Sequence, residues 1–215
     1  MIEAILGIDI SKKDLSLALL SKGTCKKNKL PNTQEGFEEL TQWLYKQGVN
    51  KIKACMEATG SYGEKLADYL YAEGHGVHII NPACIKAFAK SKLSRHKTDE
   101  ADAVLIAEYA SKNELRPYKP SPFYFKELRS LYRCSQNLKL QKTQISNFLE
   151  NKDNLPRSVR EVYQTLFSQI EDQLQTIELS IEELLSHQEE LRKDYQNLQT
   201  IPGIGKTTAV AILAE

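Results

Sequence analysis

Four acidic residues have the types and positions that metal-ion chemistry needs. Asp9 ends the first apolar segment, Glu57 directly follows another, and Asp99 and Asp102 stand three residues apart. That spacing puts the last two on one face of a helix. Converging carboxylates repel one another unless a cation neutralises them, and paired magnesium ions about 3.5–4 Å apart can activate a nucleophile at a phosphodiester. The sequence therefore predicts an acidic site of Asp9, Glu57, Asp99 and Asp102 that binds Mg²⁺ or Mn²⁺.

Each carboxylate alone also has an ordinary structural explanation. Asp99 or Asp102 would be favoured in the first turn of any helix by the helix dipole. Asp9 could cap a turn, and Glu57 could pair with a lysine. Together, the four acids lie at two strand ends and in one helical turn, and this joint placement favours the metal site. The same arrangement is found in the ribonuclease-H-like nucleases.

The elements that position these acids follow from the apolar pattern. Short apolar or alternating runs predict strands, and helical spacing predicts helices. We expect strands at 3–10, 15–19, 24–30, 51–56 and 76–80, with helices from about 34 to 47, 61–73 and 99–112. Three consecutive strands followed by alternating helices and strands predict an α/β fold with a mixed sheet flanked by helices, which together with the placement of the acids is a ribonuclease-H-like fold.

A second, helical region follows the prolines at 117, 120 and 122. We place domain boundaries at 1–117, 118–199 and 200–215. A single helix is expected from about 159 to 199, with a heptad seam from Leu174 to Leu198. This all-α region could cap a bundle, but the seam favours a coiled-coil hairpin or a dimer arm, and hence a homo-oligomer.

Basic residues are concentrated in the middle of the chain although the net charge is only +1. Solvated helix faces would explain either basic segment alone. Together, beside an acidic site, they favour contacts with nucleic-acid phosphates. The predicted nucleic-acid-binding residues are Lys90, Lys92, Arg95, His96, Lys97, Arg129, Arg133 and Lys139.

The glycines near residue 204 do not make a nucleotide-binding loop. The pattern G-x-x-x-x-G-K-[ST] would need glycine where Thr200 stands, and a strand before it. Gly203, Gly205 and Lys206 suit instead the hairpin of a helix-hairpin-helix element that contacts a DNA phosphate. A tight turn between packed helices explains the same pattern equally well.

The composition fits a globular protein, with 41% apolar and 27% charged residues. No apolar run reaches the roughly 18 residues of a membrane span, and the first residues do not resemble a secretory signal. The four cysteines are scattered, which favours reduced thiols. We therefore expect a cytoplasmic protein with no membrane partner.

The chain also resembles the DEDD transposases, which include pilin-gene invertases and bridge-RNA-guided recombinases of insertion sequences. The resemblance rests on GIDISKKDLSLAL, CMEATGSYGEKLADYL, INPACIKAFAKSKLSRHKTDEADA and IPGIGKTTAVAILAE, in that order. It implies that Asp9, Glu57, Asp99 and Asp102 are the catalytic, metal-binding acids of a RuvC-like domain followed by a coiled coil. It also implies DNA and a structured guide RNA as partners.

Members of that family continue into a second catalytic domain that carries a serine nucleophile. This chain stops at Glu215, and none of its serines lies in the family's serine motif. We therefore expect a chain truncated before that domain.

The predicted function is metal-dependent DNA cleavage and strand exchange by a transposase of a mobile element, guided by RNA. Two alternatives remain. An ATPase of the actin and sugar-kinase type shares the sheet, but would follow Asp9 with small phosphate-binding residues rather than Ile10-Ser11-Lys12-Lys13. The second alternative is a non-catalytic assembly module that binds nucleic acid and acts through the coiled coil.

Overall fold

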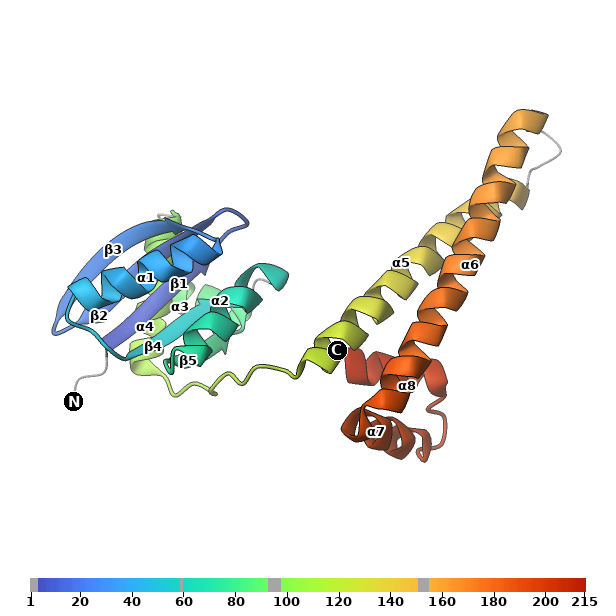
Figure 1. Cartoon of the computed structure of the whole chain (residues 1–215). Helices are drawn as coiled ribbons and strands as arrows, with labels where there is room; N and C mark the ends of the chain where they lie inside the picture. The colour runs from blue at the N-terminus through green and yellow to red at the C-terminus, as the bar shows by residue number, and fades with distance from the viewer. Residues whose placement is uncertain (1–3, 59, 93–97, 151–154) are drawn as a thin grey trace. The chain divides into compact units, whose positions relative to one another are not determined.

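The computed structural model describes residues 4–58, 60–92, 98–150 and 155–215, and divides the chain into two compact units (Figure 1). The first unit is Met1–Pro120 and the second is Ser121–Glu215. The division falls three residues after the predicted boundary at 117. Tyr118 stays with the first unit because its backbone N–H donates to the carbonyl oxygen of Val77 and its hydroxyl donates to Asp68, both at 2.7 Å.

The first unit is built on a five-stranded mixed sheet in the order β3-β2-β1-β4-β5. The first three strands form an antiparallel meander, and β4 and β5 continue the sheet parallel to β1. This is the ribonuclease-H-like sheet that the sequence predicts. The strands are β1 Ala4–Ile10, β2 Asp14–Ser21, β3 Thr24–Pro31, β4 Ile52–Glu57 and β5 Gly76–Ile80.

Helices cover both faces of the sheet, as Figure 1 shows. On one face, α1 (Gln34–Lys46) and α2 (Ser61–Ala72) bury the largest apolar cluster, which includes Leu6, Ile8 and Met56. On the other face, α4 (Asp99–Lys112) packs on β1 and β2, and α3 (Pro82–Ser91) packs beside it. The sequence does not predict α3 as a separate helix, whereas the other elements of this unit lie where they are expected.

The second unit contains four helices within its described residues. The first two, α5 and α6, lie side by side as a hairpin (Figure 1). The third and fourth, α7 and α8, pack at the open end of that hairpin. Their bounds are α5 Phe123–Glu150, α6 Arg157–His187, α7 Glu189–Gln199 and α8 Lys206–Ala214.

The prediction of one helix from 159 to 199 is wrong. The helix ends at His187, and Gln188 adopts an extended backbone with φ −110° and ψ 104° before α7 begins. The break turns α7 so that Leu191 joins the apolar cluster of Ile181 and Leu185. None of the described helices is both long and apolar enough to cross a bilayer.

Candidate active site

Strand register places Asp9 and Glu57 on the same face of the sheet. Ile8 on β1 pairs with Met56 on the parallel strand β4, so the next residues, Asp9 and Glu57, follow at neighbouring positions. The side chains of Ile8 and Met56 lie in the core under α1 and α2. Because side chains alternate along a strand, Asp9 and Glu57 point to the opposite face, where α4 lies.

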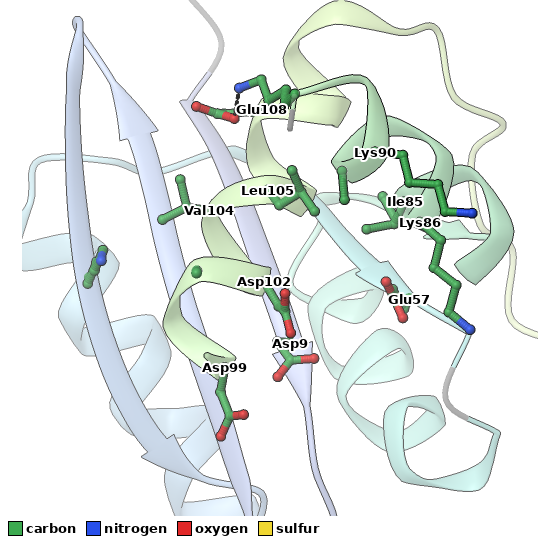
Figure 2. Close-up of a pocket in the computed structure, with 14 residues that line it drawn as sticks. Asp9, Glu57, Ile85, Lys86, Lys90, Asp99, Asp102, Val104, Leu105 and Glu108 are labelled. Carbon is green, nitrogen blue, oxygen red and sulfur yellow. Dashed lines mark hydrogen bonds and ion pairs between the residues drawn. The ribbon is translucent and has the colours of Figure 1, made fainter. Parts of the chain in front are cut away.

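The first turn of α4 supplies the other two acids. The hydroxyl oxygen of Thr98 accepts a hydrogen bond from the backbone N–H of Ala101 at 3.2 Å and caps the helix. Figure 2 shows the carboxylates of Asp102 and Asp9 close to each other, with Asp99 on one side of them and Glu57 on the other. Asp9, Glu57 and Asp102 are half-buried, whereas Asp99 is exposed.

Small residues let α4 approach the sheet closely enough to bring the carboxylates of Asp9 and Asp102 together. Gly7 lies two residues before Asp9 on the same face, and a β-carbon at Gly7 would come within 2.2 Å of the Ala103 carbonyl oxygen. Ala103 and Ala107 pack in one buried cluster with Ala18 of β2. A larger residue at Gly7 would push the helix, and with it Asp102, away from Asp9.

All four predicted acids line one pocket of about 980 Å³. A fifth carboxylate, Glu108, and four lysines line the same pocket. The lysines are Lys27, Lys86, Lys90 and Lys92. The pocket therefore combines an acidic centre with basic walls, which suits a cation together with an anionic substrate.

The donor set fits a hard divalent cation. Carboxylate oxygens are the ligands that Mg²⁺ and Mn²⁺ prefer. Within the described residues, no three His, Cys, Asp or Glu side chains are grouped closely enough to hold one ion. Mg²⁺ is usually held by one or two carboxylates, with water and substrate phosphates completing its shell. Asp9 and Asp102 have the positions to supply those carboxylates, with Glu57 and Asp99 beside them.

Helix α3 forms one basic wall of the pocket. Lys86 and Lys90 are exposed and extend from α3 on the Glu57 side (Figure 2). Lys92 forms an ion pair with Glu108 of α4, and its ammonium group lies 5.3 Å from the centre of the Phe88 ring. Three predicted nucleic-acid contacts, Arg95, His96 and Lys97, lie outside the described residues.

The remaining predicted contacts lie in the second unit. The Nε–H of Arg129 donates to the carbonyl oxygen of Ala214 at 2.7 Å, and Arg133 donates twice to the carboxylate of Glu215, at 3.0 and 2.9 Å. Both guanidinium groups therefore connect α5 to the end of the chain. Lys139 is half-buried on α5.

The predicted phosphate-contacting turn joins α7 to α8. Gly203 has φ +89°, a conformation that favours glycine, and Gly205 caps α8, which begins at Lys206. This helix–turn–helix geometry is compatible with both a phosphate contact and a simple tight turn.

Sequence reasoning missed Lys27 and Glu108 as pocket residues, and it did not nominate Lys86. The pairing of β2 with β3 could have indicated Lys27, because alternation from buried Leu30 puts Lys27 and Lys29 on the side of Asp9. Glu108 stands six residues after Asp102, about 240° around α4, so helical spacing from Asp102 does not indicate it, and without α3 there was no partner to assign to it.

The comparisons with known proteins identify the family of the chain. A profile of the DEDD transposases, described as transposase, matches residues 6–152. The pilin gene-inverting proteins of Moraxella bovis and Moraxella lacunata are each 31% identical to the chain. Each alignment covers 99% of this chain and 66% of the relative, so the chain spans just under two-thirds of the length of these relatives.

Solved structures of RuvC from Thermus thermophilus also resemble the chain, at 14% identity. The structure of the protein alone has a TM-score of 0.39 and the complex with a Holliday junction substrate has 0.38; each match covers 54% of this chain and 99% of that one. The family profile matches well over half of the residues of the chain. The chain therefore belongs to the DEDD transposase family.

Proposed function

We propose that this chain provides the metal-dependent acidic site of a transposase that cleaves and exchanges DNA strands in site-specific recombination of a mobile element. The observation that carries the proposal is the pocket that Asp9, Glu57, Asp99 and Asp102 share. Membership of the transposase family and the names of the two pilin gene-inverting relatives support DNA as the substrate.

The residues of the pocket have distinct parts in this proposal. Asp9 and Asp102 would hold Mg²⁺ or Mn²⁺, and Glu57 and Asp99, which line the same pocket, complete the acidic group. When bound, the ion would polarise a phosphodiester and activate the attacking oxygen. Lys86 and Lys90 attract the DNA backbone and offset the charge of the carboxylates.

Guidance by structured RNA and assembly into a homo-oligomer belong to the same proposal. The guide RNA rests on the family resemblance. The oligomer rests on the helical hairpin of α5 and α6, although the seam positions Leu174 and Ile181 are already buried within one chain. An interface between copies would therefore use other positions, such as Leu166 and Leu179, which are exposed.

Metal binding by variants of single acids tests the proposal. Asp9→Asn and Asp102→Asn keep the side-chain shape and remove one charge each, so Mn²⁺ affinity measured by calorimetry should fall by about 10-fold or more. Asp172→Asn, at an exposed position on α6, is the matched control and should bind Mn²⁺ like the wild type. Equal affinity in all four proteins would refute the metal site.

Cleavage assays separate the proposed activity from its rivals. Branched and supercoiled DNA should be cut with Mg²⁺ or Mn²⁺ by the wild type and not by Asp9→Asn. Release of phosphate from ATP without cutting of DNA would support the ATPase reading instead. Binding of RNA or DNA by both proteins with no metal-dependent chemistry would support the assembly module.

A further inference from the structure

The edge strand β3 carries an unusual concentration of positive charge next to the acidic pocket. From Leu15 to Pro31 the chain has four lysines, Lys22, Lys26, Lys27 and Lys29, and no acid. The residue before this stretch, Asp14, forms a solvent-exposed ion pair with Lys29 at 3.5 Å, which is weak for the same reason as any exposed pair. In β3, Leu30 is buried and Asn28 is half-buried, and the other six residues are exposed. Lysines on an edge strand commonly prevent sheets from pairing edge to edge, and that role would not depend on which face each lysine occupies.

Register shows that the lysines of β3 are divided between the two faces. Lys29 pairs with Ser16 of β2, and Ser16 pairs with Asp9 of β1, so the three residues form one row across the sheet. Lys27 lies two residues away on the same face. Lys26 lies on the opposite face, where its ammonium group donates to the side chain of Gln47 at 2.5 Å.

Lys27 also reaches the pocket. It is one of the residues that line it, and its ammonium group lies 3.5 Å from the Glu100 carboxylate on the first turn of α4. The two side chains are 48% and 63% exposed. An ion pair so exposed contributes little to stability, so Lys27 can exchange Glu100 for a phosphate at small cost.

The two groups of lysines flank the acids from opposite sides. Lys86 and Lys90 belong to α3, which packs over β4 and β5 through Ile85, Cys55 and Ile80. Lys27 and Lys29 belong to β3, at the other end of the sheet. Neighbouring strands are about 4.8 Å apart, so the backbone of Lys29, two strands from β1, lies roughly 10 Å from that of Asp9. That distance corresponds to about three nucleotides, since each nucleotide of a duplex strand spans about 3.4 Å of the axis.

We infer that Lys27 and Lys29 form a second anchor for the phosphodiester backbone of a nucleic acid, which crosses the pocket from α3 to β3. The inference rests on the proposed function and adds to it the path of the substrate and two binding residues. Lys27 and Lys29 position the backbone by charge and do not read bases. The cleaved phosphate would then lie between two basic walls, over Asp9.

Binding across a salt series tests the anchor, with the double variant K27A/K29A and the matched single variant K26A. Duplex DNA and structured RNA are titrated separately against the full 215-residue chain. Each lost phosphate contact should lower the log–log slope by about 0.9 on duplex DNA and weaken binding roughly 5- to 10-fold at 0.1 M salt. K26A should match the wild type, and a larger loss on one polymer identifies which backbone β3 holds.

Photo-crosslinking gives a second readout, which reports the position of the nucleic acid in a chain that keeps Lys29. Benzophenone side chains introduced at position 27 should crosslink to the nucleic acid, whereas the same group at position 26 should not. Equal slopes for wild type and K27A/K29A, or equal losses in K26A, would overturn the anchor.

These experiments distinguish failure of the Lys27/Lys29 anchor from failure of the proposed function. An unaffected K27A/K29A alongside a metal-binding defect in Asp9→Asn refutes the anchor alone. A wild type that binds neither duplex DNA nor structured RNA refutes both.

Discussion

Gly7 of β1 and Ala103 of α4 lie so close that a β-carbon on Gly7 would come within 2.2 Å of the Ala103 carbonyl oxygen. The same β-carbon would lie 2.5 Å from the backbone nitrogen of Ala107. Since both contacts are to helix backbone, neither can be relieved by a side-chain rotation. The absence of a side chain at Gly7 therefore sets the distance between the sheet that carries Asp9 and the helix that carries Asp102.

Gly7→Ala should move α4 and weaken the metal site. We expect a loss of about 1–3 kcal/mol in the free energy of unfolding, as for other overpacked cores, and a fall in Mn²⁺ affinity in protein that still folds. Gly76→Ala is the matched control, because a β-carbon there has 3.6 Å to its nearest neighbour. Thermal unfolding and calorimetry check both variants, and unchanged Mn²⁺ affinity in folded Gly7→Ala would contradict the positioning role.

The N-cap of α4 should matter for the acidic site beyond its effect on stability. Thr98→Ala removes the hydroxyl that holds the first turn, at a cost of about 1 kcal/mol. Thr33→Ala removes an equivalent cap on α1, where the hydroxyl accepts from Gly36 at 3.3 Å. Both variants should lose similar stability in denaturant titrations, but only Thr98→Ala should lose Mn²⁺ affinity, because Asp99 and Asp102 belong to the turn that it caps.

The seam of α6 should stabilise the single chain. Ile181 is 8% exposed and packs with Leu185 in the apolar cluster of the second unit, whereas Leu179 is 60% exposed. Ile181→Asp buries a charge and should cost several kcal/mol, measured by thermal unfolding. Leu179→Asp should leave stability nearly unchanged. Light scattering of both variants then separates folding from assembly: an Ile181→Asp chain that stays folded but dissociates would show that the seam joins two copies.

Acid should destabilise the first unit partly through His75. Burial lowers the pKa of His75 below its ordinary value of 6.5, with Lys51 acting in the same direction and Glu73 against it. Its Nδ1 is buried and has no hydrogen-bond partner among the described residues. The unfolded chain therefore takes up the proton first, and the stability present above pH 6.5 is lost as the pH falls through the lowered pKa.

Unfolding titrations between pH 7.5 and 5 check this expectation. His75→Gln should show a shallower loss of stability towards acid than the wild type. His187→Gln, at an exposed position on α6, should keep the wild-type slope. Parallel curves for His75→Gln and the wild type would contradict the assignment.

The sequence predicts much of the fold because its strands have strong local signals. Alternation in the second strand and short apolar runs in the first and fourth strands indicate the sheet, and their ends carry Asp9 and Glu57. The helix α3 is missed because its one buried residue, Ile85, gives no helical periodicity. The break at Gln188 is missed because no proline or glycine marks it; packing of Leu191 against the second-unit core decides it.

The acidic part of the site is more predictable than its basic walls. Acids at strand ends and in a first helical turn are visible in the sequence, and the structure brings all four to one pocket. Lys27 is far from them along the chain and reaches the pocket only through the β2–β3 register. From the sequence, Arg129 and Arg133 resemble residues that contact phosphates. In the structure they bond to Ala214 and Glu215, which are far from them along the chain.

Anomalous diffraction from crystals of the chain grown with Mn²⁺ tests the central claim most directly. The account predicts a peak in the pocket, with carboxylate oxygens of Asp9 and Asp102 within about 2.5 Å of the ion. The peak should disappear in Asp9→Asn crystals grown in the same solution. Ordered carboxylates with no peak in the wild type, or a peak that persists in Asp9→Asn with the same occupancy, would contradict the assignment of this pocket as the metal site.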